Sequence, residues 1–104
     1  MAAHLQGRVH ALNVTDGSRA VMRMSSVAAC RLLLEAGSEP VLQLACRDRN
    51  RIALQADLLG AHALGIRNLL CLTGDPVRTG DQPEVRPVNE LESVKLLQQV
   101  EALN

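Results

Sequence analysis

Apolar and polar residues follow one another in three repeated blocks, each a short apolar run followed by a longer stretch with helical spacing. The short runs are "VHALNV" (Val9 to Val14), "PVLQLAC" (Pro40 to Cys46) and "RNLLCLTG" (Arg67 to Gly74). Short runs rich in Val and Leu are typical of buried strands. We therefore expect three strands that start about 30 residues apart, the length of one βα unit.

The longer stretches predict three helices. They span Ser26 to Gly37, Asn50 to Gly65 and Asn89 to Leu103. Ser25 or Ser26 can cap the first helix, and Asn50 is the expected N-cap of the second. Gly37 suits the left-handed residue that follows a helix. The apolar positions expected to face the core are Leu54, Leu58 and Ala61 in the second helix, and Leu91, Val94, Leu97 and Val100 in the third.

Strands that alternate with helices predict an α/β fold with parallel strands and right-handed crossovers. Two architectures fit this order. One is a βαβαβα arc of a (β/α)8 TIM barrel, and the other is a small open three-stranded doubly wound sheet. A complete barrel needs about 250 residues, so the 104 residues of this chain would supply less than half of one.

Polar residues follow each predicted strand, in "NVTDG", "ACRDRN" and "LTGDP". Ligands of parallel α/β folds sit at the C-terminal ends of the strands. The residues expected to crowd this rim are Thr15, Asp16, Arg47, Asp48, Thr73 and Asp75. For Asp16 and Asp48 a role in capping turns and helices is the favoured alternative. Asp75, between Gly74 and Pro76, is interpreted as functional, with a plain turn residue as the alternative.

Side chains alternate between the two faces of a strand. On this basis we assign Asn13, Thr15, Gln43, Leu69, Cys71 and Thr73 to a pocket-lining face, and Leu42, Leu44, Leu70 and Leu72 to the face that meets the helices. Gln43 is the unusual member, because a buried amide without partners costs a few kcal/mol. Its partners are either a ligand or neighbouring side chains. The polar stretch from Gly74 to Val88 is long for a connecting loop, and loops of that length are more often functional than idle.

Composition excludes several classes of protein. Lys plus Arg balances Asp plus Glu at 11 each, which removes the basic surface expected of a nucleic-acid binder. No apolar run is long enough for a membrane span and no signal peptide is evident, so we expect a cytoplasmic protein. Cys30, Cys46 and Cys71 are widely spaced and are interpreted as reduced thiols. No metal-ligand spacing, nucleotide-binding glycine motif or nucleophile motif is present.

The blocks "CRDRNR", "LLGAHALGIRN" and "LTGDP", together with "VTDGS", resemble the 5,10-methylenetetrahydrofolate reductase family of flavin-dependent TIM barrels. The similarity runs from about Val9 to Leu97. It implies that residues 1–104 form a single partial domain, with about strands two to four of the barrel and their helices. The implied reaction is the reduction of methylenetetrahydrofolate to 5-methyltetrahydrofolate. The implied cofactor is FAD, with FMN as the alternative, and NADH or NADPH is the expected electron donor.

The resemblance also assigns roles to single residues. Thr15 would approach the flavin ring, and Gln43 stands where some members carry a His that touches it. Thr73, which replaces an Arg of other members, and Gly74 would line the cofactor. Asp75 would lie near the flavin and the bound folate, where a carboxylate favours hydride donation.

The family's general acid is a Glu in a motif like "FEFFPP", and nothing like it precedes Val9. We therefore expect no catalytic residue in this chain and no activity from it alone. In the full protein the resemblance suggests an iron–sulfur partner subunit or a fused methyltransferase domain. An isolated arc with open edges is expected to self-associate or to be poorly stable. The alternatives are a non-catalytic flavin- or nucleotide-binding module and a remnant that binds no ligand.

Overall fold

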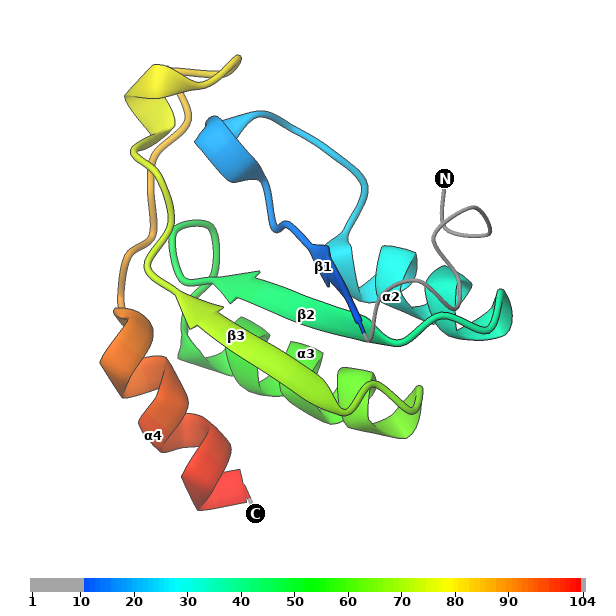
Figure 1. Cartoon of the computed structure of the whole chain (residues 1–104). Coiled ribbons are helices and arrows are strands. Elements are labelled where there is room, and N and C mark those ends of the chain that lie inside the picture. Colours follow the sequence, from blue (N-terminus) through cyan, green and yellow to red (C-terminus); the bar gives the residue numbers. More distant parts are fainter. Residues whose placement is uncertain (1–10, 104) are drawn as a thin grey trace.

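The computed structural model describes residues 11–103 of the chain and places three parallel strands in one sheet. The strands are β1 (Leu12–Val14), β2 (Pro40–Ala45) and β3 (Asn68–Leu72), with β2 in the middle. The helices are α2 (Ser26–Glu35), α3 (Arg51–Ala63) and α4 (Ser93–Leu103). Two short 3-10 helices, η1 (Ser18–Ala20) and η2 (Val77–Thr79), lie in the loops after β1 and β3. The predicted α/β order is confirmed (Figure 1).

The helices pack on one face of the sheet, and this arrangement separates the two candidate architectures. Leu42 and Leu44 of β2 are both buried on that face. Leu42 packs with residues of α2 and α3, and Leu44 packs with residues of α3 and α4. A doubly wound sheet carries helices on both faces, whereas each strand of a barrel carries its helix on the outside. Together with the sequential order β1-β2-β3, this identifies the fold as an arc of a barrel.

Local signals at the ends of α2 and α3 are confirmed in part. Ser25 occupies the N-cap position of α2, but its side chain makes no capping hydrogen bond, and the buried hydroxyl of Ser26 has no partner among the described residues. The side chain of Asn50 accepts a hydrogen bond from the backbone N–H of Ala53 at 3.0 Å, so it caps α3. Gly37, just after α2, has a φ of 86°, the left-handed conformation that glycine adopts at little cost. The third helix is shorter than predicted. Asn89 has a φ of 44° and cannot join a right-handed helix, so α4 begins at Ser93.

The apolar stripe of α3 is confirmed, whereas that of α4 is wrong in two places. Leu54 and Ala61 are buried in the core. In α4 the fully buried residue is Leu96, while Val94 and Leu97 are 57% and 52% exposed. The reason is that α4 packs at the β3 end of the sheet, where only one row of its side chains reaches the core.

The face assignment of the third strand is also wrong. In the register of the sheet, Leu69 lies beside Leu42 and Cys71 beside Leu44. Leu69 and Cys71 therefore point to the helices, where both pack against the core. Leu70 takes the other face, beside Gln43, and is 44% exposed. In "NLLCL" four successive residues are apolar. The sequence therefore has no apolar–polar alternation from which the two faces of this strand could be assigned. Val9 and His10, the predicted start of the first strand, lie outside the described residues.

The three thiols are free, as expected. Cys30 and Cys46 are buried, and Cys71 is half-buried. Burial raises the pKa of the Cys30 thiol to about 11, and it also raises the pKa of Cys46 and of Cys71. These side chains act as small apolar core residues.

Candidate functional site

A cavity of about 280 Å³ opens at the C-terminal ends of the three strands. Its lining includes Asp16, Gln43, Arg47, Thr73, Gly74 and Asp75. Four of the five residues that the resemblance assigned to the cofactor are therefore together. The fifth, Thr15, is exposed and is not part of this lining. Most of the predicted rim thus lines one hollow at the end of the sheet.

Gln43 projects from the middle of β2 on the face that none of the described helices covers. Within residues 11–103 its side-chain amide makes no hydrogen bond. No described neighbour satisfies it, so the amide is free to donate and accept at the cavity wall. Thr73 has a partner of its own, because its hydroxyl accepts a hydrogen bond from the backbone N–H of Ser93 at 3.1 Å. That contact ties the end of β3 to the start of α4.

Gly74 lets the chain turn closely over the end of β2. Its φ is 102°, a conformation that other residues rarely adopt. A Cβ at this position would lie 2.9 Å from the Cβ of Arg47 and 3.4 Å from that of Ala45. The glycine therefore allows the loop after β3 to rest on the residues that follow β2.

The carboxylate of Asp75 links two loops. Its Oδ2 accepts a hydrogen bond of 2.6 Å from the backbone N–H of Arg19, in the loop after β1. The other oxygen has no hydrogen-bond partner among the described residues. Asp75 is therefore more than a turn residue, because one oxygen holds the loop after β1 while the other is unpaired among the described residues.

A second contact of the same kind lies further along. Asp81 accepts a hydrogen bond of 3.1 Å from the backbone N–H of Met22. Figure 1 shows the two loops side by side beyond the ends of the strands, the loop after β1 in blue and the loop after β3 in yellow. Two loops that are joined by these hydrogen bonds therefore cover the site.

We expect Gly80→Ala to separate these loops. An added Cβ would lie 1.9 Å from the backbone oxygen of Ala20, so the backbone must shift. The free energy of unfolding is expected to fall by about 1–3 kcal/mol. Urea denaturation followed by circular dichroism measures the change. Gly60→Ala is the matched control, because nothing lies within 4 Å of a Cβ there; equal losses in both variants would show that the loop contact is unimportant.

Asp16 is the centre of a buried ion-pair network rather than a simple turn cap. Its Oδ2 accepts hydrogen bonds from the backbone N–H of Ala45 at 2.8 Å and from Arg49 at 2.6 Å, and its Oδ1 accepts from Arg49 at 3.1 Å. Arg49 also pairs with Asp57 of α3 at 2.9 Å. Burial alone lowers the pKa of Arg49, but the hydrogen bonds and charges of Asp16 and Asp57 outweigh it and the pKa is raised.

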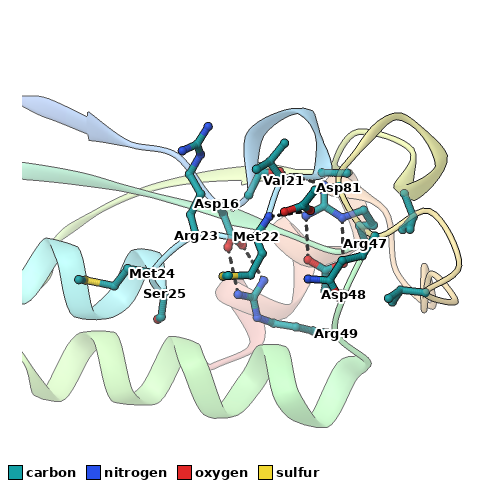
Figure 2. A pocket seen from close by; sticks show the side chains of 15 residues that line it. Asp16, Val21, Met22, Arg23, Met24, Ser25, Arg47, Asp48, Arg49 and Asp81 are labelled. Carbon is teal, nitrogen blue, oxygen red and sulfur yellow. Dashed lines mark hydrogen bonds and ion pairs between the residues drawn. The ribbon is translucent and has the colours of Figure 1, made fainter.

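Asp48 likewise is an ion-pair partner rather than a cap. Both of its oxygens accept hydrogen bonds of 2.8 Å from the guanidinium of Arg47 (Figure 2). These hydrogen bonds raise the pKa of Arg47 and lower that of the Asp48 carboxyl, because each charge stabilises the other. Arg47 is thus held by the next residue in the chain, and Arg49 by carboxylates of the loop after β1 and of α3.

A second hollow of about 410 Å³ lies beside the first, and sequence reasoning missed it. Figure 2 shows it between the loop after β1, the ion pairs and the loop after β3. Val21, Met22 and Met24 contribute to its wall. In the sequence, the signal for this hollow was the pair Met22 and Met24. No regular apolar pattern surrounds them, so they predict neither a helix nor a strand.

The described residues limit the chemistry of the site. Between residues 11 and 103 no group of three His, Cys, Asp or Glu side chains is placed to hold a metal ion. In the same range no helix is long and apolar enough to cross a membrane. The cavity offers an unpaired amide, an open carboxylate oxygen and closely approaching backbone. These groups suit the polar edge of a heterocycle better than a reactive covalent step.

Comparison with known proteins identifies a family. The family model described as "Methylenetetrahydrofolate reductase" matches residues 2–104. Searches of curated proteins and of solved structures each returned no significant match.

Proposed function

The chain belongs to the methylenetetrahydrofolate reductase family, and on this premise we propose that the cavity at the strand ends holds a flavin ring in a folate-reducing oxidoreductase. The observation that carries the proposal is the side-chain amide of Gln43, which lines the cavity and has no partner among residues 11–103. A flavin presents both a donor and acceptors on its pyrimidine edge, and an amide matches both. The flavin, when bound, supplies the hydride transfer.

The residues of this chain bind and orient rather than react. Gln43 and the open oxygen of Asp75 would contact the polar edge of the ring, and Gly74 would bring backbone close to it. The chain has no Trp, Tyr or Phe, so it offers no aromatic side chain to stack on the ring. Contacts along the edge of the ring would therefore determine its position here.

Asp75 would tune the cofactor through its charge. A fixed carboxylate beside the ring disfavours negative charge on it, and so favours hydride transfer onward to the folate. We take FAD as the flavin, NADH or NADPH as the electron donor, and 5,10-methylenetetrahydrofolate as the substrate that Asp75 also contacts. The support for these three assignments is the family match.

The general acid is not among the residues of this chain that we assign to the site. No counterpart of the "FEFFPP" segment occurs in the 104 residues, so we propose that the chain alone binds the cofactor without turnover. The open face of the sheet, with Gln43 and the exposed Leu70, is what an inner barrel wall presents when further strands complete it. A binding module without chemistry is the second candidate, favoured by the same lack of an acid.

A flavin titration tests the proposal. FAD fluorescence is expected to change on addition of the chain, with a dissociation constant of about 1–100 µM. Gln43→Ala is expected to weaken binding about three- to tenfold, the effect of losing one or two hydrogen bonds. Gln55→Ala is the matched control, because Gln55 bonds to Gln99 on the helix side and does not line the cavity. No binding, or equal weakening in both variants, would refute the proposal.

A further inference from the structure

Arg47 has an unusual environment for a cation at the end of a strand. Its side chain is buried, with the residue 4% exposed. Two hydrogen bonds go to Asp48, and Nη1 donates at 3.2 Å to the backbone oxygen of Gly17 and at 3.2 Å to that of Asp75. One guanidinium therefore joins the loop after β1 to the loop after β3.

The backbone of Arg47 holds the far end of the same loop. Its carbonyl oxygen accepts hydrogen bonds from the backbone N–H of Val88 at 2.7 Å and from that of Asn89 at 3.3 Å. Its Cβ lies under Gly74, where an added Cβ would be 2.9 Å away. The loop from Gly74 to Val88 is thus attached to Arg47 at its beginning and at its end.

We propose that Arg47 is a positioning residue that sets where Asp75 stands at the mouth of the cavity, with Asp48 orienting the guanidinium. Arg47 bonds to the backbone oxygen of Asp75, while the carboxylate holds Arg19 with one oxygen and its other oxygen has no hydrogen-bond partner within residues 11–103. Lysine cannot replace this function, because an ammonium on a flexible stem lacks the planar fork that serves Asp48 and two carbonyls together.

The first test needs no flavin. Amide hydrogen exchange of the Arg19 N–H reports the bond to Asp75. Arg47→Lys is expected to speed that exchange about tenfold, since the loop loses charge-assisted bonds that hold it. Asp48→Asn should do the same in smaller measure. If Arg47→Lys fails to fold, Asp48→Asn still tests the proposal. This variant is expected to fold because residue 48 is largely at the surface, and its amide keeps one acceptor oxygen for Arg47.

The matched control is Arg49→Lys. Arg49 lies two residues away and pairs with Asp16 and Asp57, and within residues 11–103 no hydrogen bond or ion pair joins it to Asp75. Arg49→Lys is expected to lower the free energy of unfolding without selectively changing hydrogen exchange at the Arg19 N–H. Unchanged exchange at Arg19 in both Arg47→Lys and Asp48→Asn would overturn the inference. An equal selective effect of Arg49→Lys would overturn it as well.

The second test rests on the proposed function. In a complete flavin-loaded enzyme that supplies the general acid, Arg47→Lys is expected to slow the folate half-reaction about tenfold more than it slows flavin reduction by the nicotinamide. An arginine that only stabilised the fold would slow both half-reactions together, and that result would overturn the positioning role. If the wild-type chain binds no flavin, the proposed function fails, while the exchange experiment still decides the role of Arg47.

Discussion

Replacement of Asp75 by Asn is expected to slow folate reduction by about 10- to 100-fold in a complete flavin-loaded enzyme that supplies the general acid. The substitution removes the charge and keeps the shape, because an amide oxygen can still accept the hydrogen bond from the Arg19 N–H. The loop should therefore stay in place while the electrostatic effect on the cofactor is lost. Stopped-flow absorbance at the flavin band separates reduction by the nicotinamide from oxidation by the folate. Only the second half-reaction is expected to slow.

Asp81→Asn is the matched control for that experiment. Asp81 lies in the same loop and accepts a comparable hydrogen bond from the Met22 N–H, but it does not line the cavity at the strand ends. It should leave both half-reactions within about twofold of the wild type. Folate kinetics that are the same in Asp75→Asn as in the wild type would sink the assigned role of Asp75.

Asp16→Ala is expected to lower the free energy of unfolding by about 2–4 kcal/mol, the largest stability effect that we predict. The change leaves the backbone N–H of Ala45 and two nitrogens of Arg49 without their buried acceptor. Urea denaturation followed by circular dichroism is the suitable measurement, because the chain has no Trp or Tyr for fluorescence.

Asp57→Ala provides the comparison within the same network. Asp57 pairs with the other side of Arg49, but its side chain is 38% exposed. Water can replace it, so the expected loss is below about 1 kcal/mol. If Asp57→Ala destabilised the protein as much as Asp16→Ala, burial of the Asp16 pair would not be the source of its effect.

The sequence predicted those parts of the fold that depend on neighbouring residues. The cap at Asn50 and the left-handed Gly37 are local features, and both were found where expected. The third strand was misassigned because its faces are determined by its register with β2, a contact between segments far apart in the chain. The late start of α4 follows from the backbone of Asn89, which no simple pattern indicated.

The candidate site, like the fold, could be predicted from the sequence only in part. Parallel strands bring their C-terminal ends to one edge, so the gathering of Gln43, Gly74 and Asp75 could be predicted from order alone. The partners of the charged side chains could not be predicted in this way. Asp16 and Asp48 were interpreted as caps, yet both bind arginines that follow β2. A short carboxylate next to a turn fits either role by sequence, and only the packed loops decide between them.

The most direct test of the central claim, that the cavity at the strand ends holds a flavin, is a titration of the 15N-labelled chain with FAD followed by NMR. We predict that the largest chemical-shift changes fall on the side-chain amide of Gln43 and on the backbone amides of Gly74 and Asp75. Signals of Met24 and Val85, in the neighbouring hollow, should move little. Changes centred on Met24 and Val85, or no changes at saturating FAD, would contradict it.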